Sequence, residues 1–123
     1  MSVRVERVGN QIRRILSEMV VSGEIRDPGL SGALVTLTEV RVSRDLSLAT
    51  IFFAVSGGAE VEQQVEAALN RAAGFMRTRV GQEMRLRLVP QLRFLVDRSV
   101  EQGQRIEELL KSLNIPPADD TAS

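Results

Sequence analysis

The sequence predicts an α+β fold whose elements follow the order α-β-β-α-α-β, with a three-stranded mixed sheet and the helices on one face of it. Three observations predict this fold. Apolar residues recur at helical spacing over residues 3–21, two strand-like runs flank a short polar break at residues 43–46, and residues 71–98 join a helix to a third strand. With 123 residues, 43% of them hydrophobic, the chain is long enough for one core and one domain.

The first helix is expected over residues 3–21. Its apolar residues follow the i, i+3, i+4 pattern of a helix that packs through one face: Val5, Val8, Ile12, Ile15, Leu16, Met19 and Val20. Gly23 is expected to end this helix, and residues 26–29 are expected to form a turn.

Two strands are expected next, over residues 34–42 and 48–55, because both runs are rich in β-branched or apolar residues. The alternation of the first run breaks near Glu39, which predicts a bulge. The break between the runs is too short to join anything but antiparallel neighbours. The second run is almost continuously apolar, which is typical of a central strand.

A second helix is expected over residues 60–72, followed by a kink at the small residues 72–74 and a third helix to about residue 84. The third strand is expected over residues 91–96, after Pro90. Since two helices connect the second and third strands, these strands are expected to be parallel.

The apolar spacing also predicts individual burial. We expect Phe53, Phe75 and Phe94 to be buried, and Leu86 and Leu88 to point inward between outward-facing arginines. Phe52 is expected on the uncovered face of the sheet.

The charge distribution is uneven although the net charge is zero. Residues 71–98 carry seven of the fifteen arginines and only two acids, which gives this segment a net charge of +5. A basic segment attracts anions locally even when distant acids balance it, so the segment indicates a phosphate-backbone binder. The excess of arginine over the single lysine also fits a GC-rich genome, and that alternative stays open.

The composition excludes several classes of protein. Without cysteine and histidine there is no disulfide framework, thiolate metal site or histidine-based triad. We therefore expect no enzyme, no catalytic residue, no cofactor and no metal. No apolar run of the sequence resembles a signal peptide or approaches membrane-spanning length, and we expect a cytoplasmic protein.

The order α-β-β-α-α-β is that of a KH-type RNA-binding domain of the second topology. KH domains grip nucleotide backbone with a G-x-x-G loop, and here Ala72-Ala73-Gly74 stands in its place. Two interpretations stay open: the small residues let RNA backbone approach, or they relieve crowding where helices pack. Residues 1–113 are expected to form a single KH-like RNA-binding domain that ends in a short helix, and residues 114–123 a disordered tail.

Four segments in order resemble the ribosome-binding factor A family: RVERVGNQIRRILSEMV, IRDPGL, VRVSRDLSLATIFFAV and AAGFMRTRVGQEMRLRLVPQLRFLVDRS. The resemblance covers roughly residues 4–113. It implies a KH-like factor that binds the free 30S subunit and 16S rRNA, assists late assembly and processing of the 16S precursor near its 5′ end, and matters most in the cold. The short acidic C-terminus departs from the basic extension that would be expected of an RNA-binding family.

The candidate RNA-binding residues come from three places: the basic segment, the kink, and the turn between the first two strands. They are Arg44, Arg71, Ala72, Ala73, Gly74, Arg77, Arg79, Arg85 and Arg87. The expected partners are the 30S ribosomal subunit and 16S rRNA, with no membrane and no small-molecule substrate, and the protein is expected to be a monomer. The alternative function is a protein–protein adaptor that uses the exposed face of the sheet.

Overall fold

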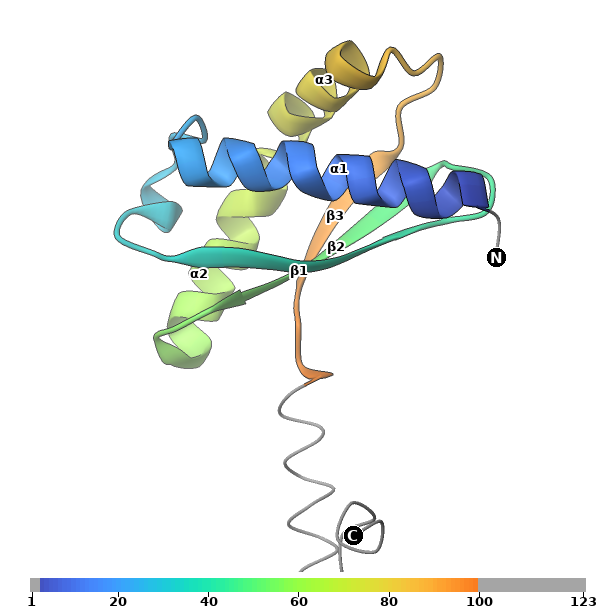
Figure 1. Cartoon of the computed structure of the whole chain (residues 1–123). Coiled ribbons are helices and arrows are strands. Elements are labelled where there is room, and N and C mark those ends of the chain that lie inside the picture. Colours follow the sequence, from blue (N-terminus) through green and yellow to red (C-terminus); the bar gives the residue numbers. More distant parts are fainter. Residues whose placement is uncertain (1–2, 100–123) are drawn as a thin grey trace, which may run out of the picture.

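The computed structural model describes residues 3–99 of the chain. These residues form one layer of helices on one face of a three-stranded sheet (Figure 1). In chain order the elements are α1 (Val3–Ser22), a 3-10 turn η1 (Pro28–Leu30), β1 (Val35–Val42), β2 (Leu48–Val55), α2 (Gly58–Arg71), α3 (Ala73–Met84) and β3 (Gln91–Val96). The predicted order α-β-β-α-α-β is confirmed, and the expected C-terminal helix and tail lie outside the described residues.

The first helix packs along the sheet through the stripe that the sequence predicted. Ile12, Leu16 and Met19 are at most 1% exposed. Helix α1 lies against β1 at Gly9, where an added Cβ atom would make an ordinary van der Waals contact with the Val40 carbonyl oxygen at 3.4 Å. The helix ends before Gly23, whose φ of +76° is the left-handed conformation that favours glycine at this position.

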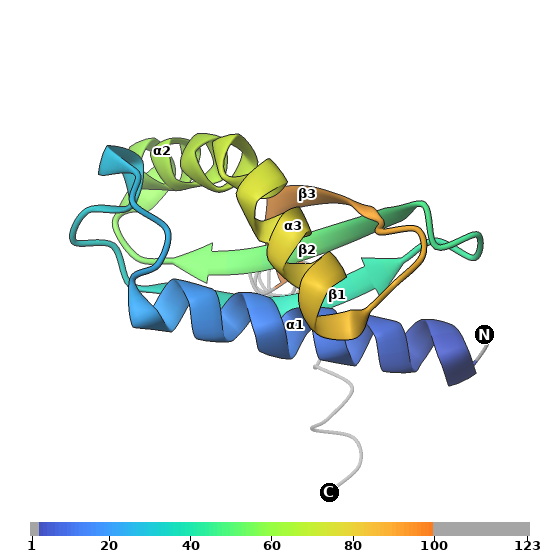
Figure 2. The ribbon, with the colours of Figure 1, turned by 90° about the horizontal axis from the view of Figure 1, so that it is seen from above.

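The sheet has the order β1-β2-β3, with β2 in the centre. The short hairpin makes β1 and β2 antiparallel, and the register shifts between Leu37 and Glu39, which confirms the predicted bulge. Strands β2 and β3 are parallel, as a crossover through two helices requires. Figure 2 shows α3 crossing above the sheet between α2 and the loop that leads into β3.

The two crossover helices meet at Ala72, which forms a backbone hydrogen bond with each of them. The Ala72 amide donates to the Ala68 carbonyl oxygen at 3.1 Å, and the Met76 amide donates to the Ala72 carbonyl oxygen at 3.0 Å. Ala72 and Ala73 are half-buried and pack against the core. The step is therefore a kink between two helices and not a loop.

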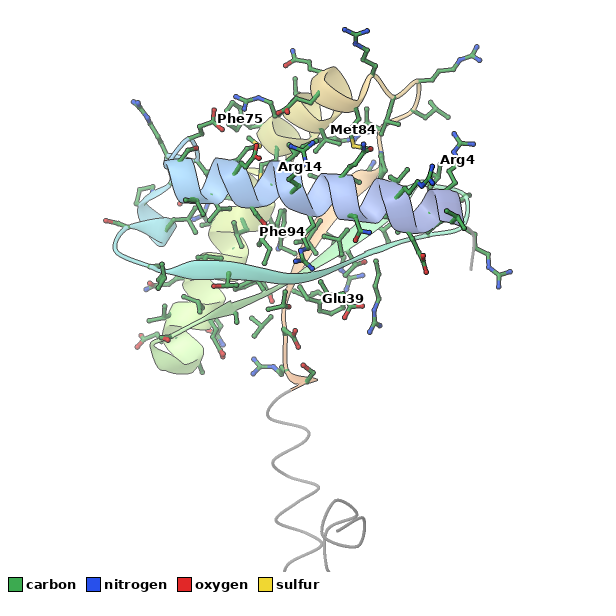
Figure 3. All side chains as sticks on the ribbon, viewed as in Figure 1. Arg4, Arg14, Glu39, Phe75, Met84 and Phe94 are labelled. Atoms are coloured by element: carbon green, nitrogen blue, oxygen red, sulfur yellow. The ribbon has the colours of Figure 1, made fainter. Side chains whose placement is uncertain are left out.

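The core lies between the helices and the sheet, and it corrects two of the burial predictions. Phe53 and Phe94 are 0% exposed as predicted, and Figure 3 shows Phe94 beneath α1. Phe75 is 53% exposed, so its predicted burial is wrong: Met76 and Val80, one helical turn apart, take the inward positions of α3.

Leu88 is 82% exposed, so its predicted inward direction is also wrong. Residues 85–90 form an irregular loop, where strand-like alternation does not hold. Leu86, Val89 and Pro90 supply the inward contacts of this loop instead.

Candidate nucleic-acid interface

Three of the candidate arginines make contacts within the protein. Arg71 stands at the end of α2 and forms a two-pronged ion pair with Asp27, with its Nε and Nη2 donating to the two carboxylate oxygens at 3.0 and 2.9 Å. The same carboxylate caps η1 by accepting from the Gly29 amide at 2.9 Å. The Arg71 guanidinium first, and the Gly29 amide second, lower the pKa of Asp27 to about 2. Arg71 therefore fastens η1 to α2.

Arg79 is the second arginine with acidic partners. Its Nη2 and Nη1 donate to the two carboxylate oxygens of Glu24 at 2.9 and 3.1 Å, and Nη1 also lies 3.9 Å from Glu83. Glu24 and, to a smaller extent, Glu83 raise the pKa of Arg79. The ion pair with Glu24 keeps the guanidinium beside the C-terminal end of α1. A phosphate would have to compete with Glu24 for this guanidinium.

Arg77 binds backbone and not carboxylate. Its Nη2 donates to the Val89 carbonyl oxygen at 2.8 Å, and its Nε donates to the Pro90 carbonyl oxygen at 3.1 Å. These contacts fix the loop between α3 and β3 on the side of α3. Because Arg77 keeps its positive charge and its side chain is exposed, it can still contribute to an anion-attracting surface.

The remaining three candidates, Arg44, Arg85 and Arg87, make no side-chain ion pair or hydrogen bond within residues 3–99. Arg44 lies in the β1–β2 turn, while Arg85 and Arg87 lie in the α3–β3 loop. The two segments adjoin, because the Gln91 amide donates to the Ser47 carbonyl oxygen at 2.9 Å. Figure 2 shows them on one side of the molecule together with the N-terminal end of α1. We call these three arginines the basic end.

A hollow of about 220 Å³ lies at the basic end. Its walls come from the start of α1, the β1–β2 turn and the α3–β3 loop: Arg4, Val8, Asp45, Leu46, Leu86, Arg87, Leu88 and Pro90. Asp45 is the acid of this hollow, and hydrogen bonds from the Ser47 and Ser43 hydroxyls lower its pKa and keep it ionised. The hollow therefore combines two arginines, Arg4 and Arg87, with the one negative charge of Asp45.

The kink contributes an open surface beside the basic end. A Cβ atom on Gly74 would meet no atom within 4 Å, whereas one on Gly81 would lie 2.7 Å from Val89 Cγ2. Gly81 is thus the glycine of α3 that packing requires, and Gly74 is not. Gly74, Arg77 and Arg87 line one groove of about 500 Å³ along α3 and its following loop.

Arg4 and Leu88 line the hollow at the basic end, but the sequence analysis did not select them as candidates. Arg4 lies at the start of α1 (Figure 3), far in sequence from the residues of the β1–β2 turn and the α3–β3 loop that line the same hollow. Leu88 was assigned to the core because it alternates with arginines. Only the fold brings α1 beside the α3–β3 loop, so no local signal could have found Arg4.

Two features are absent from the described part of the chain, a cluster of metal ligands and a membrane-spanning helix. Within residues 3–99, no three acidic side chains come close enough to one another to hold a metal ion. In the same range, no helix combines the length and apolar character needed to cross a membrane.

The comparisons with known proteins agree with one another. A family model described as "Ribosome-binding factor A" matches residues 4–110. A protein of that name from Magnetococcus marinus is 46% identical over 121 residues, which cover 98% of this chain and 97% of the relative.

A crystal structure and a set of coordinates fitted into a map resemble the fold. The crystal structure of ribosome-binding factor A from Thermus thermophilus has a TM-score of 0.64 and 28% identity, and the match covers 77% of this chain and 98% of that one. Coordinates of a Thermus thermophilus homology model, fitted into a cryo-electron-microscopy map of a 30S–RbfA complex, match with a TM-score of 0.58 and 29% identity over 73% of this chain and 91% of that one.

Proposed function

The chain belongs to the ribosome-binding factor A family, and on that premise we propose that it binds the free 30S ribosomal subunit through 16S rRNA. In this proposal it acts in the cytoplasm as a monomer, assists late assembly of the subunit and processing of the 16S precursor near its 5′ end, and catalyses no reaction itself. The relative fitted into a 30S–RbfA complex supports this partner.

The observation that carries the proposal is the basic end. Arg44, Arg85 and Arg87 are exposed and unpaired within the described residues, while the neighbouring Arg71 and Arg79 are already held by acids. Planar guanidinium groups without internal partners are suited to phosphate oxygens, which they bind through two parallel hydrogen bonds. The open groove along α3 gives rRNA backbone room to approach Gly74 and Arg77.

The experiment that tests the proposal is co-sedimentation of the purified chain with isolated 30S subunits over a range of salt concentrations. The double variant Arg85→Ala/Arg87→Ala should bind more weakly. The slope of log affinity against log salt should become shallower by about 1.4 for single-stranded contacts and about 1.8 for duplex contacts, because two phosphate contacts are lost. The free energy of unfolding should change little, since both side chains are exposed and unpaired within residues 3–99.

A matched control removes the same charge elsewhere. Arg13 lies exposed on α1, and Arg26 lies exposed after α1, at the end remote from the β1–β2 turn. The double variant Arg13→Ala/Arg26→Ala should keep both the affinity and the salt slope. Equal losses in the two double variants would show that net charge and not the basic end governs binding, and the proposal would then be wrong.

The adaptor function has one observation in its favour. On the open face of the sheet, Arg41 lies over the ring of Phe52 at 5.2 Å, and both side chains line a hollow of about 300 Å³. A partner that covered this hollow would give a shallow salt dependence. Phe52→Ala would then weaken subunit binding while Arg85→Ala/Arg87→Ala would not.

A further inference from the structure

We propose that Leu88 is an rRNA contact, an apolar side chain held out between arginines to pack against an unstacked base. This inference rests on the proposed function and adds to it a residue that makes no charged contact. Leu88 is 82% exposed although its neighbours in the loop turn inward. It lines both the hollow at the basic end and the groove along α3.

The loop that presents Leu88 is fixed on both sides. On its C-terminal side, Val89 packs against Gly81, Pro90 is buried, and Arg77 binds the carbonyl oxygens of both residues. On its N-terminal side, Leu86 packs against the core. An exposed leucine on a mobile loop would lose side-chain and backbone freedom on binding, whereas this one is already positioned.

Arg85 also contributes to this presentation. It ends α3 with φ 52° and ψ 40°, the left-handed conformation that glycine usually adopts at the end of a helix. A non-glycine residue there is disfavoured by steric contacts of its Cβ atom. The fold accepts this conformation at the residue that begins the Leu88 loop, and the Arg85 guanidinium there has no partner within residues 3–99.

The charges around Leu88 favour RNA over protein as its partner, because arginines outnumber the single acid, Asp45, that lines the same hollow. Arg87 adjoins it in the chain, Arg85 lies three residues before it, and Arg44 lies in the adjoining turn. A nucleotide supplies phosphate oxygens for such arginines and, between them, the apolar face of a base. Apolar side chains inserted against base steps are a common device of nucleic-acid-binding proteins.

The test compares two leucines of nearly equal exposure. Leu88→Ser is matched by Leu34→Ser, since Leu34 is 84% exposed and lies immediately before β1. Loss of the buried contact should weaken 30S binding of the full chain carrying Leu88→Ser by about tenfold, with the salt slope unchanged because no charge is removed. Leu34→Ser should bind as the unchanged chain does. Both variants should unfold at the same denaturant concentration as the unchanged chain.

If Leu88→Ser binds as well as Leu34→Ser does, the inference is wrong. That outcome differs from failure of the proposed function, in which the unchanged chain itself does not bind 30S subunits and the inference falls with it. A photoreactive leucine analogue at position 88 identifies the contacted molecule. A cross-link to a 16S rRNA nucleotide supports the inference, and a cross-link to a ribosomal protein overturns it.

Discussion

Gly74→Ala is the substitution that best separates folding from binding in this chain. Gly74 lies in the first turn of α3, its φ is not positive, and an added Cβ would meet nothing within 4 Å. Alanine should therefore stabilise the free protein by about 0.4–1 kcal/mol, because it restricts the unfolded chain more than glycine does. If rRNA backbone approaches the helix here, the added methyl group crowds that contact and should cost about 1–3 kcal/mol of binding, which is roughly a 5- to 150-fold loss of affinity.

Gly81→Ala provides the contrast within the same helix. Its Cβ would lie 2.7 Å from Val89 Cγ2, and Val89 cannot move freely because its side chain is branched at Cβ and Arg77 holds its carbonyl oxygen. Alanine at this position should destabilise the fold by about 1–3 kcal/mol. Any loss of binding would then follow from displacement of the α3–β3 loop.

The two effects are measured by urea unfolding of each variant and by co-sedimentation with 30S subunits at one salt concentration. Gly74→Ala should give a higher urea midpoint with weaker binding, and Gly81→Ala a lower midpoint. A Gly74→Ala variant that is more stable and binds normally would refute the approach of RNA at the kink. A Gly74→Ala variant that is destabilised would show that the space around Gly74 at the start of α3 is not open.

Three further predictions concern the fold and its charges. Phe94→Ala should lower the free energy of unfolding by about 3–5 kcal/mol in chemical denaturation, because the ring is 0% exposed. The Asp27–Arg71 pair should stabilise the fold fully above about pH 4 and lose that effect as the pH falls toward the folded pKa of Asp27, about 2. When the free energy of unfolding is measured against pH, Asp27→Asn should lack the part of the acid decline that comes from this pair. Arg77→Ala should lower the thermal midpoint because two carbonyl groups lose their donor, whereas Arg87→Ala should leave it unchanged.

Most of the fold could be predicted from the sequence because each element carries its own periodic signal. The second and third strands begin and end at the predicted residues, and the bulge lies where the alternation breaks at Glu39. Which residues of α3 face the core could not be predicted in the same way. Phe75 and Met76 are adjacent apolar residues, and only the kink at Ala72 and the packing of α3 over the sheet decide that Met76 turns inward.

The candidate site was less predictable, because arginine contacts depend on partners distant in sequence. Asp27 lies 44 positions from Arg71, and Glu24 lies 55 positions from Arg79. Neither pairing has a local signature comparable to an i, i+4 charge pair on one helix. The sequence therefore predicted that residues 71–98 are basic, but it could not separate arginines that hold the fold together from those that remain available.

The segment between α1 and β1 decides which of the candidate arginines are paired with acids. This segment packs against α2 through η1, where a Cβ on Gly29 would lie 2.9 Å from the Cβ of Ala68. The same segment supplies both Glu24 and Asp27, so arginines on the adjoining part of α2 and α3 meet carboxylates. The α3–β3 loop lies beyond their reach, beside the β1–β2 turn, where Asp45 is already hydrogen-bonded to serine hydroxyls. Among the candidate arginines, the three without a partner within residues 3–99 thus lie away from Glu24 and Asp27, and a ligand rich in phosphate is the partner that such a surface favours.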